Sequence, residues 1–243
     1  MDPSLPLIAP GLTPDFHAPD FYPEVCEPLE EVAAARPADA STALAFALSR
    51  LARNEVGDDP RPWVMATTPL WLRERGRPFA RGLAGMGAAP ERLIWIRAAK
   101  EAEALWALEE ALKSGAVAGG VVTAEQPAFV MTRRLDFAAR AGGARGVVLR
   151  AGPALDLSAA RMRWRIASAP SAKGEFDEAA PGPARIAVEL VRRRAGPPGS
   201  WILEQDDEAG GFRVVAGLAG HGLADAGAER SGRPAATTSA AAA

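Results

Sequence analysis

Residues 93–123 read LIWIRAAKEAEALWALEEALKSGAVAGGVVT and hold two apolar runs around a helical pattern. Between the runs, residues 100–114 repeat leucine at the spacing of one helix face, and Gly115 then provides a helix stop. The flanking runs at 93–96 and 120–123 are too short for helices and predict buried strands. A strand–helix–strand unit of this length predicts two parallel strands joined by a right-handed crossover.

The same alternation continues on both sides of this unit. Helices are predicted at 41–53, at 70–83 with a break near Arg77-Pro78, and at 127–141, and strands at 29–32, 62–67 and 146–149. Strands that alternate with helices over more than a hundred residues predict a mainly parallel sheet covered on both faces.

The pattern changes after residue 160. Short apolar runs separated by turn residues predict strands at 161–169, 184–193, 199–204 and 212–216. We therefore expect a C-terminal antiparallel β-meander at one edge of the sheet.

The composition is that of a globular protein with one large domain. The chain has 243 residues, is 48% hydrophobic and carries 28 Lys and Arg against 30 Asp and Glu. We expect an extended acidic arm at 1–27, a folded domain at 28–220 and a disordered tail at 221–243. Because the chain shows no secretion signal, no membrane span and a single cysteine, Cys26, we expect it in the cytoplasm.

Charge is unevenly distributed along the chain. Residues 1–31 hold seven acidic side chains and no Lys or Arg, whereas residues 133–165 hold eight arginines against two aspartates. This asymmetry predicts self-association or a charged partner. The alternative is two differently charged solvated faces.

Residues for nucleophilic or zinc chemistry are scarce. The two histidines, His17 and His221, lie in the predicted arm and tail, and no motif of a hydrolytic triad or zinc site occurs. The position of a phosphate-binding loop, residues 33–44, contains neither Gly nor Lys. Ser41 and Thr42 remain there, and an ordinary helix cap accounts for both.

Two segments resemble the core of RecA. Residues 93–122 match it in the order strand, helix ending in L-x-S-G-A-V, and central strand, with EALKSGAV at 110–117 as the best motif. The segment LVRRRAGPPGSWILE at 190–204 resembles the hairpin that ends the RecA ATPase core. The chain combines these segments with degenerate nucleotide motifs. In this it resembles the ImuA group of RecA-like, damage-inducible mutagenesis proteins, over roughly residues 28–218. The resemblance implies an α/β, RecA-like three-layer core followed by the β-meander.

The resemblance also places a degenerate nucleotide site. Its phosphate loop would fall at 36–43, the water-activating carboxylate at Thr67 and the magnesium-associated aspartate at Thr123, with Glu125 two residues beyond. The site therefore comprises Arg36, Pro37, Ser41, Thr42, Thr67, Thr123 and Glu125. The phosphate-binding loop, the magnesium ligand and the carboxylate that activates water are all missing. We therefore predict no ATP hydrolysis, no catalytic residue, no metal and no cofactor.

A second set of residues is predicted to bind a partner or DNA. The arginine triplet 192–194 falls where RecA has basic residues near the neighbouring subunit. The run 161–165 of this chain alternates arginine with other residues and includes an aromatic ring, which could stack on a base. The set is Arg161, Arg163, Trp164, Arg165, Arg192, Arg193 and Arg194. For Arg192, Arg193 and Arg194 the alternative is a solvated edge strand on which charge blocks unwanted pairing. For the run 161–165 the alternative is a strand on which Met162, Trp164 and Ile166 face the core.

Tryptophans divide by their predicted burial. Trp63 and Trp95 fall in predicted core strands, and packing would also account for Trp106 on the main helix. Trp71, Trp164 and Trp201 stand in positions predicted to be less buried.

By this resemblance, the protein would be a non-catalytic accessory protein of SOS-induced, error-prone translesion DNA synthesis. It would act as a scaffold for a Y-family-like ImuB partner and an error-prone DNA polymerase, with RecA as a further partner. DNA contact would be indirect or weak, because the connections at 123–127 and 150–156 are too short to act as the DNA-binding loops of RecA. The alternatives are a divergent RecA-type ATPase that still binds nucleotide or single-stranded DNA, and a cell-division or protease-related regulator.

Overall fold

The computed structural model describes residues 27–53, 59–153, 156–174, 176–177, 179–194, 198–206 and 210–218. The predicted acidic arm, apart from Glu27, and the predicted tail lie outside these residues. The described residues form one nine-stranded sheet in the order β3-β2-β4-β5-β1-β6-β7-β8-β9.

The first six strands in the chain run parallel to one another. They are β1 (Leu29–Ala34), β2 (Trp63–Thr67), β3 (Leu93–Arg97), β4 (Gly119–Thr123), β5 (Arg145–Arg150) and β6 (Met162–Ala169). The last three strands, β7 (Arg185–Arg193), β8 (Gly199–Gln205) and β9 (Phe212–Leu218), continue from β6 as an antiparallel meander. The α/β class and the C-terminal meander are thus confirmed. Strand β6 belongs to both halves, because it pairs in parallel with β1 and antiparallel with β7.

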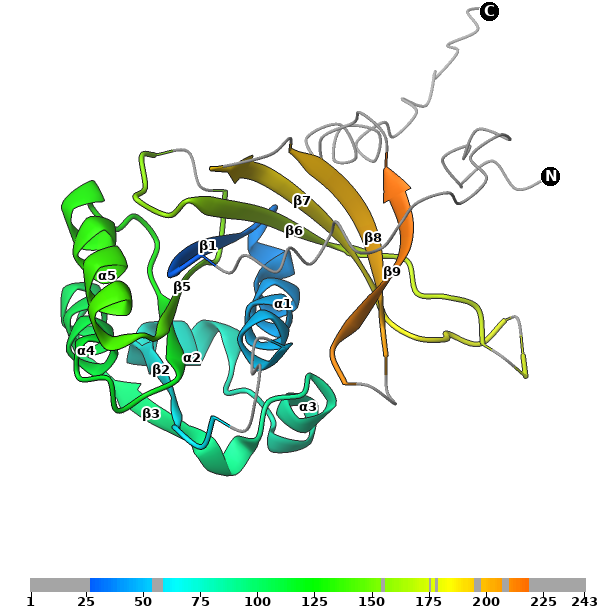
Figure 1. The fold of residues 1–243 in the computed structure, drawn as a ribbon. Coiled ribbons are helices and arrows are strands. Elements are labelled where there is room, and N and C mark those ends of the chain that lie inside the picture. The colour runs from blue at the N-terminus through cyan, green and yellow to red at the C-terminus, as the bar shows by residue number, and fades with distance from the viewer. Residues whose placement is uncertain are drawn as a thin grey trace, which may run out of the picture.

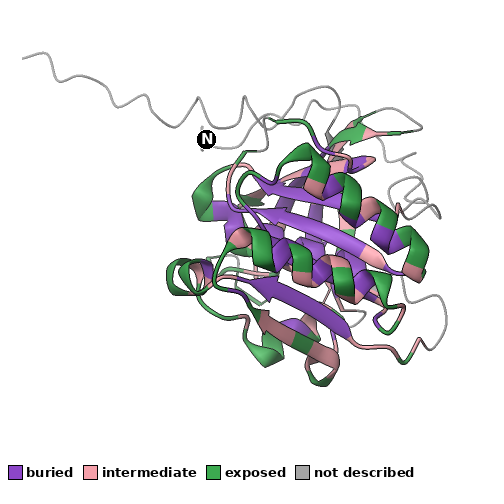
Figure 2. Ribbon diagram, turned by 90° about the vertical axis from the view of Figure 1, so that its left-hand side faces the viewer, coloured by how far each residue is buried: buried purple, intermediate pink, exposed green. Residues whose placement is uncertain are grey.

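Helices cover the sheet from two sides. Along the chain they are α1 (Ala40–Arg53), α2 (Pro69–Arg75), α3 (Ala80–Gly85), α4 (Glu101–Lys113) and α5 (Phe129–Gly142), with 3-10 turns at Pro37–Asp39 and Pro90–Arg92. One core joins α1, α2 and α3 to the sheet and extends under the meander, and the other joins α4 and α5 to the opposite face. Figure 1 shows this layering, and Figure 2 shows buried strands behind helices whose outer sides are exposed.

Local sequence accounts for where the helices begin and end. The Thr68 hydroxyl accepts a hydrogen bond from the Trp71 N–H at the start of α2, and Pro69 occupies its first turn. Gly76, with φ 79°, follows the end of this helix, and α3 begins only at Ala80. The break predicted near Arg77-Pro78 is therefore confirmed.

A glycine in β4 lets the main helix approach the sheet. A Cβ at Gly120 would lie 2.6 Å from Leu108 Cδ1 of α4 and 2.8 Å from the Val64 carbonyl oxygen of β2. Both distances are shorter than van der Waals contact, so only glycine permits this spacing between α4 and the sheet.

Strand β3 differs from its prediction as a buried strand. It lies at the edge of the sheet and pairs only with β2, and Ile94 is 45% exposed. The hydrophobic pattern of a four-residue apolar run does not distinguish a central strand from an edge strand. The prediction of a buried strand was wrong for this reason.

The predicted burial of the tryptophans is wrong at four positions. Trp106 is 56% exposed on the outer side of α4, although packing was expected there. Trp71, Trp164 and Trp201, expected to be less buried, are at most 9% exposed. At Trp164 and Trp201 the neighbouring residues gave the wrong indication, because alternation along a strand puts adjacent side chains on opposite faces. Trp71 lies on helix α2 and packs into the core from there.

Candidate functional site

The connection between β1 and α1 holds the predicted phosphate loop. Here the Arg36 guanidinium pairs with the Asp39 carboxylate, with 3.0 Å between Nε and Oδ2. Asp39 is 1% exposed and also accepts a hydrogen bond from the Ser168 N–H of β6, at 3.0 Å. A buried carboxylate therefore lies at the head of α1, where helix N–H groups would otherwise attract an anion.

The Asp39 carboxylate stays charged despite its burial. Burial by itself raises the pKa of this carboxyl group, but the hydrogen bonds from Arg36 and Ser168 lower the pKa by more, so that the net shift is downward. This charge neutralises the Arg36 guanidinium, so the ion pair offers a phosphate group no net positive charge at the head of α1.

The other residues of the predicted loop make ordinary structural contacts. The Pro37 carbonyl accepts a hydrogen bond from Arg75 Nη1 at 2.8 Å. Ser41 is exposed on the first turn of α1, and Thr42 Oγ1 lies 2.8 Å from Ser168 Oγ.

The carboxyl ends of β2 and β4 carry a buried hydroxyl pair. Thr123 Oγ1 donates a hydrogen bond to Thr67 Oγ1 at 2.9 Å, and both residues are at most 3% exposed. The two threonines are joined by this hydrogen bond and bring no charge to the end of the sheet. Glu125 points into solvent, and its N–H donates to Glu101 at 2.8 Å. The structure thus brings Thr67 and Thr123 together and leaves the Glu125 carboxylate exposed.

Arg150 connects three segments at this end of the sheet, and it was not among the predicted site residues. Its side chain is 1% exposed; Nε lies 3.4 Å from Glu31 Oε1, and Nη2 donates to Asp156 at 3.1 Å. Nη1 also donates to the Glu125 carbonyl at 3.2 Å. The hydrogen bonds from Arg150 lower the pKa of the Asp156 carboxyl group. The connections that follow β4 and β5 are therefore tied to each other and to β1.

Two adjacent glutamates of β1 anchor buried ion pairs on opposite faces of the sheet. Glu30 faces α1, where it binds Arg50 Nη2 at 2.7 Å and Trp164 Nε1 at 2.7 Å. Glu31 faces the other side and accepts a hydrogen bond from Arg163 Nη2 at 2.7 Å. Neither glutamate was predicted as a site residue, because the partners that bind them lie 20 to 134 residues further along the chain.

These contacts correct one predicted binding residue. The Trp164 ring is 1% exposed, packs edge-on against Phe46 and donates its indole N–H to Glu30. Its assignment to a partner or DNA surface is wrong, and the alternative, in which Met162, Trp164 and Ile166 face the core, is confirmed.

The predicted arginines fall into two groups. Arg161 lies 3.9 Å from Glu27, and Arg165 pairs with Glu189 at 3.2 Å, on the same side of the sheet as Arg163. In the register of β6 and β7, Arg192 lies opposite Arg163, whereas Arg193 lies opposite the core-facing Met162. Arg194 follows the end of β7 and is exposed. Whether these arginines bind a partner stays a prediction.

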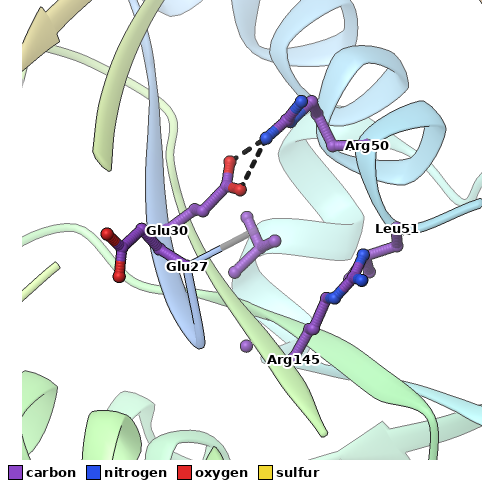
Figure 3. A pocket seen from close by; sticks show the side chains of 7 residues that line it. Glu27, Glu30, Arg50, Leu51 and Arg145 are labelled. Atoms are coloured by element: carbon purple, nitrogen blue, oxygen red, sulfur yellow. Dashed lines mark hydrogen bonds and ion pairs between the residues drawn. The ribbon is translucent and has the colours of Figure 1, made fainter. Parts of the chain in front are cut away.

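A small cavity lies at the opposite end of the strands. It has about 10 Å³ of space for water and is bordered by Glu30, Arg50 and Leu51 together with Glu27, Arg145, Gly146 and Val147 (Figure 3). Such a volume holds about one water molecule. The cavity is therefore too small for a nucleotide or another organic substrate.

Among the residues that the structure describes, no three His, Cys, Asp or Glu side chains are grouped so as to hold a metal ion. Over the same residues, no helix has both the length and the apolar character needed to cross a membrane.

The charge of Asp39 predicts a pH dependence. In the Asp39→Asn variant, an amide oxygen still accepts the hydrogen bond from the Ser168 N–H, but the ion pair with Arg36 is lost. This variant should have a free energy of unfolding about 1–2 kcal/mol lower at pH 7. Because the folded pKa is lowered, the stabilisation is complete above the unfolded value of about 3.9 and is lost as pH falls through the folded pKa.

Urea unfolding of the wild type and the Asp39→Asn variant between pH 7 and pH 3 measures this difference. The gap between the two proteins should narrow as the pH falls below about 4. A gap of constant size across this range would show that folding leaves the pKa of the Asp39 carboxyl group unchanged, which contradicts the prediction.

Comparison with known proteins adds a family likeness. No family model matches the sequence. Protein ImuA of Caulobacter vibrioides, from strain NA1000 / CB15N and from strain ATCC 19089 / CIP 103742 / CB 15, is 44% identical over 174 residues, which cover 66% of this chain and 71% of the relative. The crystal structure of SulA from Pseudomonas aeruginosa is 26% identical and covers 51% of this chain and 98% of the SulA chain, with a TM-score of 0.39. That score is too low to support a statement about shared architecture or function.

Proposed function

The chain belongs to the ImuA family of damage-inducible mutagenesis proteins, and on this premise we propose that it is a non-catalytic, RecA-like accessory protein of SOS-induced, error-prone translesion DNA synthesis. Its work would be binding, and no bond would be made or broken. The observation that carries this proposal is the Arg36–Asp39 ion pair at the head of α1: Asp39 neutralises the arginine of a loop that lacks Gly and Lys, where a nucleotide phosphate would need attraction.

Two further features support the loss of nucleotide chemistry. Phosphoryl transfer needs a metal ion to neutralise charge and a group to orient the nucleophile. Thr67 and Thr123 stand at the corresponding strand ends, where they bring no carboxylate and the Thr123 hydroxyl donates to that of Thr67. Arg150 holds the neighbouring connections in a fixed arrangement.

The proposed partners are a Y-family-like ImuB protein and an error-prone DNA polymerase, with RecA as a further candidate. The scaffold would offer them large exposed apolar side chains, which in a monomer often mark an interaction site. Trp106 on α4 and Phe137 on α5 are each 56% exposed on neighbouring helices.

Calorimetric titration of the full chain with ATP and Mg²⁺ tests the non-catalytic role. We expect no binding heat in the micromolar range and no phosphate release. Binding at micromolar concentration, or any turnover, would instead establish the divergent ATPase.

A genetic test separates the same two functions in cells. Ser41→Ala removes the exposed hydroxyl that an ATPase would use as a magnesium ligand, and it should leave damage-induced mutagenesis unchanged in a complemented deletion strain. A fall in mutagenesis to the level of the deletion strain would contradict the proposal, provided that the variant protein accumulates normally.

Affinity purification from DNA-damaged cells tests the partners. The tagged chain should co-purify with the two polymerase-type proteins. Recovery of cell-division proteins in their place would favour the regulator on the same fold.

A further inference from the structure

One side of the meander carries a row of arginines. Met162, Trp164 and Ile166 of β6 pack into the core next to α1, so the residues between them point to the other side of the sheet. Cross-strand pairing places side chains of β7, β8 and β9 on that same side. We call this side the arginine face; its arginines are Arg161, Arg163, Arg165, Arg185, Arg192 and Arg213.

The carboxylates of the arginine face lie beneath its guanidinium groups. Four ion pairs join the strands: Arg161–Glu27, Arg163–Glu31, Arg165–Glu189 and Arg185–Glu204, with Arg213 as a second partner of Glu204. The glutamate side chains are only 1–16% exposed, whereas the arginine side chains are 15–58% exposed. At Arg161, Arg165, Arg185 and Arg213, a molecule that approaches from solvent therefore meets positive charge first.

The buried glutamates also hold the arginines in place. A guanidinium group has five N–H donors, and a carboxylate below it engages only some of them. An ion pair with a buried carboxylate holds each guanidinium group in place, which reduces the entropy that an arginine side chain loses when it binds an anion. Six arginines against four glutamates leave the arginine face with a net positive charge.

The composition of the arginine face favours phosphate over protein. Protein interfaces are centred on aromatic and apolar anchors and are depleted of charge. Here the large rings of the meander, Trp164, Trp201 and Phe212, all lie in the opposite core. Small side chains, Ala167 and Ala187, lie between the charged rows.

The spacing of the arginines suits a chain of anions. Alternate residues of a strand are about 6.6–6.8 Å apart, and neighbouring strands are about 4.8 Å apart. Arg161, Arg163 and Arg165 thus form a regular row, to which β7 adds Arg192 beside Arg163. Successive phosphates of an extended nucleic-acid strand repeat at a comparable distance. Long arginine side chains can adjust to the remaining difference between the two spacings.

We propose that the arginine face binds the phosphate backbone of single-stranded DNA directly and without sequence preference. The binding would be electrostatic, because the described residues of β6 to β9 offer guanidinium groups on this face and keep their aromatic rings in the core. This surface is separate from the nucleotide position, so the inference and the proposed lack of ATP hydrolysis can fail independently.

The test uses the full chain and a fluorescein-labelled oligothymidine, whose binding is followed by anisotropy at several salt concentrations. The variant Arg192→Gln/Arg213→Gln removes two charges, and Arg185 still holds Glu204 in it. The matched control, Arg81→Gln/Arg133→Gln, removes two exposed arginines from α3 and α5. Thermal unfolding followed by circular dichroism verifies that both variants fold.

We expect the wild type and the control to bind at low salt, and the arginine-face variant to bind at least about tenfold more weakly. The slope of log affinity against log salt should fall by about 1.4 in that variant, since each phosphate contact to a single strand contributes about 0.7. Equal weakening in the control pair, or no binding by the wild type, would overturn the proposal. Tighter binding of a polyglutamate peptide than of the oligonucleotide would overturn it as well, by showing that the partner is an acidic protein.

Discussion

Replacement of Arg50 by methionine is expected to lower the free energy of unfolding by about 3–5 kcal/mol. Arg50 is 3% exposed, and its guanidinium binds both oxygens of Glu30, at 2.7 and 3.3 Å. Without it, the Glu30 carboxylate is left inside the core with only the Trp164 indole N–H as a partner. Removal of one partner from a buried ion pair lowers the free energy of unfolding far more than replacement of both partners by uncharged residues.

Urea denaturation of the wild type, Arg50→Met and the double variant Glu30→Gln/Arg50→Met measures this effect. The double variant carries no buried charge at this position and should recover a large part of the lost stability. A double variant that is as unstable as, or less stable than, Arg50→Met would show that packing of the arginine, and not its charge, dominates.

Replacement of Arg150 by methionine should lower the free energy of unfolding by about 2–4 kcal/mol. The effect is smaller than that at Arg50 because Glu31 keeps Arg163, and Asp156 is partly exposed to water. The loss should also be local: the connections after β4 and β5 lose the side chain that ties them to β1.

Hydrogen exchange measured by mass spectrometry tests the local effect. Peptides that cover 124–128 and 156–161 should exchange faster in Arg150→Met, while peptides from β8 should keep their protection. An exposed arginine of α2, replaced in Arg73→Met, serves as the control and should change neither stability nor exchange. Uniform acceleration over the whole sheet in Arg150→Met would contradict a local role.

The nucleotide position illustrates how far sequence reasoning reached. The absence of Gly and Lys between Glu31 and Arg53 was evident from the sequence, and so was the pair of threonines at the strand ends. Asp39 was missed, since an aspartate before a helix is an ordinary cap residue. Its burial depends on Ser168, which lies 129 residues further along the chain.

The arginine face illustrates a partial success. The alternation of Arg161, Arg163 and Arg165 predicted one charged side of a strand, and the structure has that side. Arg185 and Arg213 were missed because each reaches the face through cross-strand register with Glu204. Register between strands depends on turn geometry and core packing, which are not local properties of the sequence.

The sequence by itself determined the succession of helices and strands, the place where parallel strands give way to a meander, and the lack of a phosphate-binding motif. These features follow from periodicity and residue type over a few neighbouring positions. Only the tertiary structure decided which charges are buried, which tryptophans are exposed and which glutamate holds which arginine. Those outcomes depend on contacts between segments distant in the chain, such as Glu30 with Trp164 and Asp39 with Ser168, and the free energy of a buried charge is set by the partner that reaches it.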